Sequence, residues 1–414
     1  MSAYDVVVVG AGIVGLASAR ELLRRRPGLR LALIDKEPRI GAHQTGHNSG
    51  VIHSGIYYAP GSSKARLCVA GARELYAYCE ANGIPTERCG KVIVATDESE
   101  LERLHNLLER GRANGVEGLE LIGPERLREI EPHCAGIRAL WSPCTGIVDF
   151  SLVAQRYALD VRDAGGEVHT GRELLGLRRL PEGVVLETTA GDLEARRVIT
   201  CGGLHADRLA GISGGAAEPR IVPFRGDYWQ LRPEARGLCR NLIYPVPDPA
   251  FPFLGVHGTR RIGTGEVWLG PNAVLAFARE GYRRRDLRPG DLAEALGNRG
   301  FQRLARRYWR MGAVEMWRDW SKRAFWRSVR RYLPDVRLSD MVPGPSGVRA
   351  QALDASGALV DDFVVDVQGA RVLHVRNAPS PAATSSLAIG RLVADAAERA
   401  WHGGAGFSTG SLAT

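Results

Sequence analysis

The segment from His43 to Tyr58 gathers side chains that can transfer protons and donate hydrogen bonds. It runs His43-Gln-Thr45-Gly-His47-Asn48-Ser49-Gly50-Val51-Ile-His53-Ser-Gly-Ile-Tyr-Tyr58. Alternating small and polar residues pack poorly as a core, but they suit a loop that wraps a ligand and directs hydroxyl, amide and imidazole groups at it. Because an imidazole titrates near neutral pH, His53 is a candidate for proton transfer, with a hydrogen-bonded core histidine as the equal alternative.

These side chains need a scaffold, and the first residues predict one. An apolar strand from Tyr4 to Val9 leads into the turn Gly10-Ala-Gly12-Ile13-Val14-Gly15 and then into a helix rich in alanine and leucine. This is the pattern of a dinucleotide-binding turn, in which the helix N-terminus faces a pyrophosphate. A second strand, Leu29 to Ile34, ends at Asp35 and Lys36, about 20 residues beyond the turn, where a carboxylate binds a ribose hydroxyl.

Two later segments extend the same site. The apolar strand from Arg197 to Thr200 runs into Cys201-Gly202, a second predicted nucleotide contact at the carboxyl end of a strand. A helix predicted from Leu387 to Ala400 follows a loop in which Ser380 can cap it and Pro381 suits its first position. The positive end of this helix would face a group that becomes negative on reduction, as the flavin N1/C2 region does. An ordinary capped helix is the alternative.

The nucleotide-binding pattern is therefore spread over the beginning, middle and end of the chain. Nicotinamide enzymes usually keep this unit compact, so the distribution favours FAD, which we expect to be bound without a covalent link. The predicted cofactor-binding residues are Gly10, Gly12, Ile13, Val14, Gly15, Asp35, Lys36, His43, Thr45, His47, Asn48, Ser49, Gly50, Val51, Cys201, Gly202, Pro379, Ala382, Ala383, Thr384 and Ser385.

Composition bounds the class of protein. With 414 residues, 44% hydrophobic and 24% charged, the chain has the size and balance of a soluble enzyme with more than one domain. Its seven cysteines form no CxxC pair, so neither a disulfide framework nor a thiolate metal site is indicated, and no histidine–carboxylate group has metal-ligand spacing. Because the first strand begins almost at once and no apolar run is long enough to span a membrane, we expect a cytoplasmic protein.

The net charge of +9 is concentrated between residues 283 and 332, where arginines alternate with aromatic residues. Three explanations compete for this basic block. A solvated helix face is the plainest, and an amphipathic surface that rests on anionic lipid is the second. Nucleic-acid binding comes last, because no recognition motif accompanies the charge, and we expect no nucleic-acid partner.

The order of predicted elements indicates an α/β fold. We expect a Rossmann-like FAD-binding domain built from the discontinuous segments 1–88, 146–220 and 345–402, and a substrate domain rich in β-sheet formed by 89–145 and 221–344. The second domain carries the basic helical block at 283–332. A Gly/Ser-rich tail at 403–414 is predicted to be disordered.

With these motifs in place, the sequence resembles the L-2-hydroxyglutarate dehydrogenases (or oxidases), FAD enzymes of the D-amino-acid oxidase fold superfamily. The likeness covers about residues 1–400. The matching runs are His43 to Tyr58, Pro60 to Ser62, Ile221 to Gly226, Tyr244 to Pro249, Pro252 to His257, Gly270 to Phe277, Arg279 to Tyr282, Gly347 to Gln351, Asp361 to Phe363 and Asn377 to Thr384.

The resemblance implies a reaction. Members of this family remove a hydride from C2 of L-2-hydroxyglutarate to flavin N5, which gives 2-oxoglutarate, and pass the electrons to a membrane acceptor, expected to be a quinone. Such a partner implies peripheral contact with the cytoplasmic face of the inner membrane. An amine or amino-acid oxidase of the same fold, which uses oxygen, is the alternative within enzymes.

That reaction requires a base for the hydroxyl proton and cations for two carboxylates. His53 is expected to be the base and His257 its partner, with the reverse assignment also open. The predicted substrate-binding residues are Tyr58, Arg225, Tyr244, Arg279, Arg349 and Asn377. For each arginine, a structural ion pair is the alternative.

Overall fold

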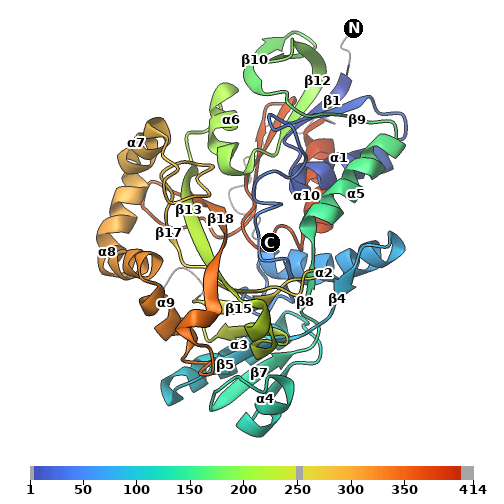
Figure 1. The fold of residues 1–414 in the computed structure, drawn as a ribbon. Helices are drawn as coiled ribbons and strands as arrows, with labels where there is room; N and C mark the ends of the chain where they lie inside the picture. The colour runs from blue at the N-terminus through green and yellow to red at the C-terminus, as the bar shows by residue number, and fades with distance from the viewer. Residues whose placement is uncertain (1–3, 249–254, 402–414) are drawn as a thin grey trace.

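The computed structural model describes residues 4–248 and 255–401, and the predicted tail at 403–414 lies outside them. The described strands form two large sheets and one small sheet, and helices pack against the outer faces of the large ones (Figure 1). The first sheet contains the first and the last strand of the described part. The second sheet is built from the middle of the chain and from β5–β7.

The first sheet has a parallel centre. Strand β1 (Tyr4–Val9) pairs with β2 (Leu31–Ile34) on one side and with β12 (Leu193–Thr200) on the other. Beyond them lie β9 (Glu167–His169), parallel to β2, and β20 (Val372–Asn377), parallel to β12. Val9 is level with both Ile34 and Thr200, so the turns that follow these three strands meet at one edge of the sheet. The antiparallel strands β10 (Leu174–Leu180), β11 (Gly183–Thr188) and β19 (Val364–Gln368) complete the sheet.

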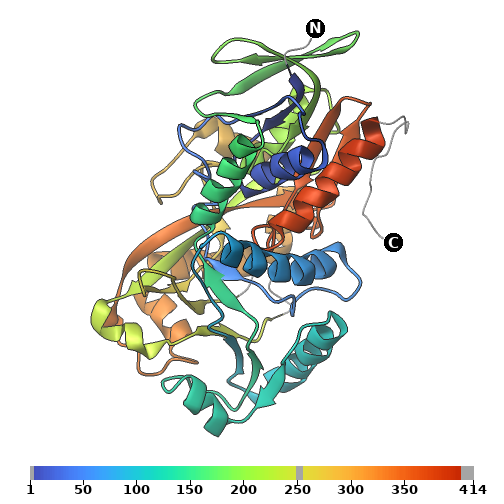
Figure 2. The ribbon, with the colours of Figure 1, turned by 90° about the vertical axis from the view of Figure 1, so that its right-hand side faces the viewer.

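Four helices cover one face of this sheet, as Figure 2 shows from the side. They are α1 (Ile13–Arg25), α2 (Ser63–Ala81), α5 (Phe150–Asp163) and α10 (Ser386–Trp401). Their buried faces and the inward side chains of β1 and β2 form one apolar core, as expected for amphipathic helices on a parallel sheet. Side chains of Ser62 and Asp149 cap α2 and α5, which fixes where those helices begin. The short helix α6 (Ala206–Ile212) lies against β20 and β12.

The second sheet is mostly antiparallel. Its order is β17-β13-β16-β15-β14-β5-β7-β6, and β18 pairs along almost the whole of β13. Its strands are β5 (Lys91–Ala95), β6 (Glu120–Ile122), β7 (Arg138–Ser142), β13 (Arg220–Leu231), β14 (Leu242–Pro245), β15 (His257–Arg260), β16 (Val267–Gly270), β17 (Val274–Leu275) and β18 (Met341–Leu353). A small sheet has the order β3-β8-β4, with β3 at Val51–Ile52, β8 at Gly146–Val148 and β4 at Thr86–Glu87.

Helices on the second sheet come from two parts of the chain. Helices α3 (Leu101–Ala113) and α4 (Pro124–Ile130) contact β5, β6 and β7. The basic block forms α7 (Pro289–Gly297), α8 (Arg299–Trp320) and α9 (Lys322–Val329). Ala295 of α7 and Leu304 of α8 belong to one apolar cluster with Phe224 of β13. Short 3-10 turns occupy Glu98–Glu100, Gly203–His205, Pro233–Leu238 and Leu338–Asp340.

Most of the predicted elements are present within a few residues, but the C-terminal loop differs. Helix α10 begins at Ser386, and residues 380–385 form turns whose Ser385 N–H donates to the Pro381 carbonyl. Ser380 therefore does not cap the helix and Pro381 does not occupy its first position. The predicted domain division stays a prediction, and β18 spans its boundary at 344/345. In the described part, no helix combines the length and apolarity that a membrane crossing requires.

Candidate active site

A cavity of about 1430 Å³ extends from the carboxyl edge of the first sheet to the second sheet. Its walls come from the beginning, middle and end of the chain, as the spread of motifs predicted. The predicted residues that line it are Gly10, Gly12, Ile13, Val14, Asp35, Lys36, His43, Thr45, His47, Asn48, Ser49, Val51, His53, Tyr58, Cys201, Gly202, Tyr244, His257, Arg349, Asn377, Pro379, Ala382, Ala383 and Thr384.

The glycine turn has the geometry that a pyrophosphate requires. Gly10 has a positive φ of 112°, and a Cβ there would collide with the Cys201 carbonyl. Helix α1 starts at Ile13, and its N-cap residue, Gly12, has no side chain that could cap it. The first turn of the helix also contains no acidic residue. The Ile13 N–H donates to Thr45 Oγ1 at 3.0 Å, and the positive helix end faces the cavity. Gly15 does not line the cavity, because it packs against the Gly10 carbonyl, the role of a third glycine in such a turn.

Asp35 lies where β2 ends, at the wall of the cavity. Two backbone groups hold its carboxylate: the Ala11 N–H donates to Oδ2 at 2.6 Å and the Glu37 N–H donates to Oδ1 at 2.8 Å. These bonds tie the glycine turn to the end of β2 and fix the carboxylate in one orientation. A carboxylate oxygen keeps further acceptor capacity, so Asp35 remains suited to a ribose hydroxyl.

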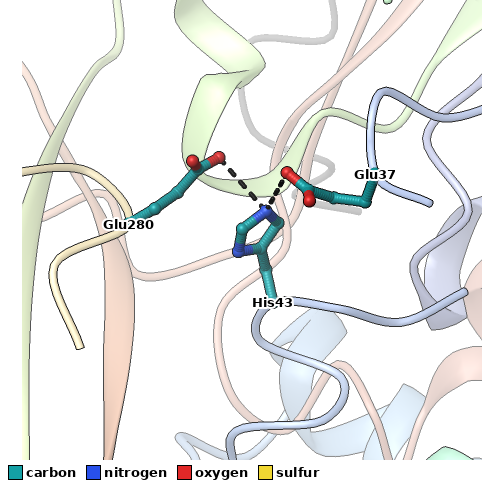
Figure 3. Close-up of side chains that lie close together, drawn as sticks. All are labelled: Glu37, His43 and Glu280. Carbon is teal, nitrogen blue, oxygen red and sulfur yellow. Dashed lines mark hydrogen bonds and ion pairs between the residues drawn. The ribbon is translucent and has the colours of Figure 1, made fainter. Parts of the chain in front are cut away.

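Beside Asp35, an ion-pair cluster joins Glu37 and His43 of the cavity wall to Glu280, and Figure 3 shows the His43 ring between the two carboxylates. His43 Nε2 lies 2.9 Å from Glu37 and 3.1 Å from Glu280, and the Lys36 ammonium contacts both carboxylates. His205 also bonds Glu280, at 2.8 Å. Sequence spacing predicted no histidine–carboxylate group near metal-ligand geometry, so this arrangement is a difference from the prediction. Because an ammonium occupies the place between the carboxylates, we assign no metal to it.

The loop from His43 to Ser49 is held by its own hydrogen bonds and by Tyr282. The ring of Tyr282 stacks on His47 with centroids 3.9 Å apart, and its hydroxyl lies 3.0 Å from His43 Nδ1. Asn48 donates to the Gln44 carbonyl at 3.1 Å, and its Oδ1 accepts from the Gly50 N–H at 2.8 Å. The amide of Asn48 therefore shapes the loop. Gly50 lies behind the lining, against Arg261 and the Val148 carbonyl, which corrects its predicted contact with the cofactor.

The C-terminal turn reaches the histidine loop directly. Thr384 Oγ1 donates to the Val51 carbonyl at 3.3 Å and accepts from the His53 N–H at 3.1 Å. These bonds join residues more than 300 positions apart in sequence and hold Pro379 to Thr384 at the cavity. Ser385 is fully buried and does not line the cavity, so its predicted cofactor contact is also corrected.

His53 and His257 both line the cavity and lie close enough to interact electrostatically. Burial lowers the pKa of each to about 3, with the nearby positive charge of Lys91 as a further cause. His257 Nδ1 lies 2.8 Å from the Gly255 carbonyl oxygen, and its ring stacks on Tyr244 with centroids 4.1 Å apart. His53 Nδ1 is buried and has no hydrogen-bond partner among the described residues. The cavity therefore contains two neutral imidazoles.

Four predicted substrate-binding residues line the cavity: Tyr58, Tyr244, Arg349 and Asn377. Arg349 lines the cavity from β18, and burial lowers its pKa from a very high ordinary value, so it stays charged. Burial raises the pKa of the Tyr58 and Tyr244 hydroxyls, so both stay protonated. The Asn377 amide donates to the Val360 and Asp362 carbonyls at 2.7 and 2.9 Å, so both its donor hydrogens are used within the fold.

Two predicted arginines do not line the cavity. Arg279 forms a two-point ion pair with Asp207, with distances of 2.5 and 2.9 Å, and both side chains are buried. Arg225 is buried between Asp227, at 3.0 Å, and Asp319, at 3.4 Å. Each guanidinium is neutralised by carboxylates inside the fold, so neither is available to a substrate. The prediction that they bind the carboxylates of a substrate is wrong, and the alternative, a structural ion pair, is what the structure shows.

Two residues that the sequence analysis did not propose for the site belong beside it. Tyr57 lines the cavity, and its hydroxyl is buried without a hydrogen-bond partner among the described residues. Lys91 is the first residue of β5 and is 1% exposed, with its ammonium 4.5 Å from the centre of the Tyr57 ring. A lysine at the start of a strand normally indicates solvent exposure, so only the position of β5 inside the sheet could reveal it.

Comparison with known proteins shows what this chain is similar to. A family model described as "FAD dependent oxidoreductase" matches residues 5–396. The chain is similar to a protein named L-2-hydroxyglutarate dehydrogenase, mitochondrial, from Nematostella vectensis, with 54% identity over 96% of this chain and 91% of the relative. The human protein of the same name is 49% identical, over 95% and 88%. A bacterial L-2-hydroxyglutarate dehydrogenase from Indibacter alkaliphilus is 45% identical, over 95% and 98%.

Solved structures agree on the fold. The L-alpha-glycerophosphate oxidase from Mycoplasma pneumoniae with FAD bound matches with a TM-score of 0.76 and 21% identity, over 98% of this chain and 96% of that one. Glycine oxidase from Geobacillus kaustophilus matches with a TM-score of 0.71 and 21% identity, over 96% and 95%. The predicted fold and the predicted FAD cofactor are thus confirmed.

One prediction is overturned by the same comparisons. The relatives from Nematostella vectensis and Homo sapiens are named as mitochondrial proteins. The expected cytoplasmic location, on the cytoplasmic face of the inner membrane, is therefore wrong. An early first strand was its main support, and that feature does not report a compartment.

Proposed function

The chain belongs to the family of FAD-dependent oxidoreductases, and on this premise we propose that it oxidises L-2-hydroxyglutarate at C2 to 2-oxoglutarate. The relatives that share 45–54% identity over at least 95% of the chain carry the name of that activity. The geometric observation that carries the proposal is that two imidazoles, of His53 and His257, and the guanidinium of Arg349 line one cavity. A base and a cation are the two groups that oxidation of a hydroxydiacid requires.

The residues that line the cavity fit FAD. The positive end of α1, whose N-cap residue is a glycine, the Gly10 position that leaves no room for a side chain, and the fixed carboxylate of Asp35 form a cradle for a dinucleotide. We assign the pyrophosphate to the turn Gly10–Gly15 and the ribose to Asp35. The loop 43–53 and the turn 379–384 would hold the remainder. Bound FAD supplies the acceptor for the two electrons and the C2 hydrogen of the substrate.

For the proton of the C2 hydroxyl, His257 is the better-prepared base. Its Nδ1 faces a carbonyl oxygen, which only accepts, so the proton of the neutral ring resides on Nδ1 and Nε2 keeps its lone pair. A dianionic substrate beside the ring favours the imidazolium and raises the low pKa of the free enzyme. His53, whose Nδ1 lacks a partner among the described residues, would bind the hydroxyl or the adjacent carboxylate.

Arg349 is the predicted arginine that we assign to a substrate carboxylate. It lies on β18 opposite Phe224 of β13, inside the second sheet, and burial favours tight pairing with an anion. Tyr58 and Tyr244 are protonated donors at the same wall. These three side chains would orient the diacid.

We also propose that the electrons pass to a quinone at a membrane surface that α8 contacts. This helix is inverted relative to an ordinary surface helix: Glu315 and Asp319 face inward, and Trp309, Trp317 and Trp320 are 64%, 65% and 73% exposed. Arg306, Arg307 and Arg310 are exposed on the same helix, and the Arg310 guanidinium lies over the Trp309 ring. An apolar aromatic face with a cationic rim is the pattern of a helix that lies in the lipid interface.

A product assay tests the proposed reaction and its alternative together. The purified holoenzyme is supplied with L-2-hydroxyglutarate and either a soluble quinone or oxygen, and 2-oxoglutarate and peroxide are measured. The proposal predicts stoichiometric 2-oxoglutarate with the quinone and little peroxide with oxygen. Turnover of glycine or sarcosine with peroxide, and none of the hydroxyacid, would instead identify an oxygen-using amine oxidase.

A further inference from the structure

Lys91 occupies an unusual place for a lysine. It lies in β5, between Ser142 of β7 and Leu242 of β14, and is 1% exposed. Strand β5 is internal to the second sheet, so the side chain cannot extend along an edge to water. A buried ammonium is costly unless its surroundings compensate the charge.

The surroundings are aromatic. The Lys91 ammonium is 4.5 Å from the centre of the Tyr57 ring and 5.1 Å from that of Tyr244. No carboxylate of the described residues forms an ion pair with it, and the titratable groups that raise its pKa are the thiols of Cys68 and Cys144. Cation–π contacts replace only part of the lost hydration. Burial accordingly lowers the pKa of Lys91 to about 8, which still leaves it mainly charged at neutral pH.

The charge of Lys91 is felt inside the cavity. Tyr57 and Tyr244 both line it, so the ammonium lies next to two of its walls. The same charge contributes to the lowered pKa of His53 and of His257. A positive charge without a protein counterion, placed against a cavity with neutral bases, prepares that cavity for an anion.

We propose that Lys91 is a positioning residue that selects a dicarboxylate substrate: from beside the Tyr57 and Tyr244 rings, its charge draws the anion to the cavity. The selectivity follows from Coulomb's law, because a dianion gains more from one buried positive charge than a monoanion does. The identity of the diacid rests on the proposed function, whereas the role of the charge does not.

Binding of two unreactive acids tests the role of the charge separately from the identity of the substrate. Glutarate is a five-carbon dicarboxylate without a hydroxyl group, and butyrate is its monocarboxylate counterpart. Their binding to holoenzyme is followed by the change in flavin absorbance, for the wild type, Lys91→Met and Lys91→Arg at about pH 7 and pH 9. Lys322→Met is the matched control, because that lysine lies 5.5 Å from the Trp229 ring, outside the cavity lining.

The proposal predicts that Lys91→Met weakens glutarate binding about tenfold or more, and butyrate binding less. Lys91→Arg retains glutarate binding, and Lys322→Met has the wild-type affinity. In the wild type, binding favours the protonated lysine, so affinity is full below the free-enzyme pKa of about 8 and falls as the pH rises through it. Arginine stays charged, so this fall is absent in Lys91→Arg.

Two results would overturn the role of Lys91: glutarate affinity within twofold of wild type in Lys91→Met, or wild-type affinity that does not change between about pH 7 and pH 9. The second needs no variant, so a Lys91→Met protein that fails to fold leaves the test intact. Failure of the proposed function is seen separately, as a wild-type flavin that L-2-hydroxyglutarate does not reduce. Loss of glutarate binding in Lys91→Met would then still support the role of the charge.

Discussion

His257 Nδ1 and the Gly255 carbonyl oxygen are 2.8 Å apart, and this contact fixes the tautomer of the ring. Nδ1 carries the proton, so Nε2 is the basic atom. His257→Gln removes the base while keeping a polar side chain of similar reach.

We expect His257→Gln to slow flavin reduction by roughly 10²- to 10⁴-fold, with a much smaller change in substrate affinity, because general base catalysis acts on the transition state. Anaerobic stopped-flow measurement of flavin reduction checks this. His169→Gln, on the surface strand β9, is the control. An unchanged reduction rate in His257→Gln, with a large loss in His53→Gln, would assign the base to His53.

The pH dependence follows from the two low pKa values. Both histidines have a pKa of about 3 in the free enzyme, so both imidazoles are neutral at every pH above about 5. Because kcat/KM reports ionisations of free enzyme, it should show no acid limb from these groups between about pH 5.5 and pH 7.5. Steady-state kinetics over this range checks it. An acid limb near pH 6.5 that disappears in His257→Gln would contradict the burial of this ring.

Arg279 and Arg349 should respond differently to the same substitution. Arg279→Met leaves the buried Asp207 carboxylate without its partner, so we expect the free energy of unfolding to fall by about 3–5 kcal/mol. Arg349→Met should instead raise the Kd for glutarate with a smaller loss of stability. Denaturant unfolding and ligand titration measure the two effects, with the exposed Arg112→Met as control. A stable Arg279→Met protein with weakened glutarate binding would return Arg279 to the substrate site.

The exposed face of α8 predicts binding to anionic lipid. Replacing Trp309, Trp317 and Trp320 by serine should abolish sedimentation with vesicles that contain acidic phospholipid, because the apolar anchors are lost while the arginines remain. The control replaces Leu152 and Leu159, exposed residues of α5, by serine. Sedimentation that is equal for all three proteins, or absent in the wild type at low salt, would show that α8 does not bind membranes.

The scaffold was predicted well, because the sequence motifs that indicate it lie close together in the chain. The glycine turn, its flanking strands and the acidic residue after β2 lie within a few tens of residues, and their roles follow from backbone geometry. The same is true of α5 and its Asp149 cap. The start of α10, predicted at Leu387, is at Ser386, whereas the roles predicted for Ser380 and Pro381 at that start are wrong, because residues 380–385 form turns that bond to the histidine loop.

The roles of charged side chains were harder to predict, because their partners are distant in sequence. Asp207 lies 72 residues from Arg279, and Asp319 lies 94 residues from Arg225. Only Asp227, two residues from Arg225, lies near its partner in sequence, and the alternation of side chains along a strand does not by itself show that the two are paired. Lys91 is the opposite case, since its burial depends on β7 and β14, which flank β5 in the sheet and follow it by about 50 and 150 residues in the chain. The sequence thus indicated which chemistry is present and left open which cation performs it.

Anaerobic titration of the purified flavoprotein with the two enantiomers of 2-hydroxyglutarate tests the central claim most directly. The account predicts that the L enantiomer bleaches the oxidised flavin band with formation of one 2-oxoglutarate per flavin, and that the D enantiomer leaves the band unchanged. A flavin that stays oxidised in excess L-2-hydroxyglutarate would contradict it.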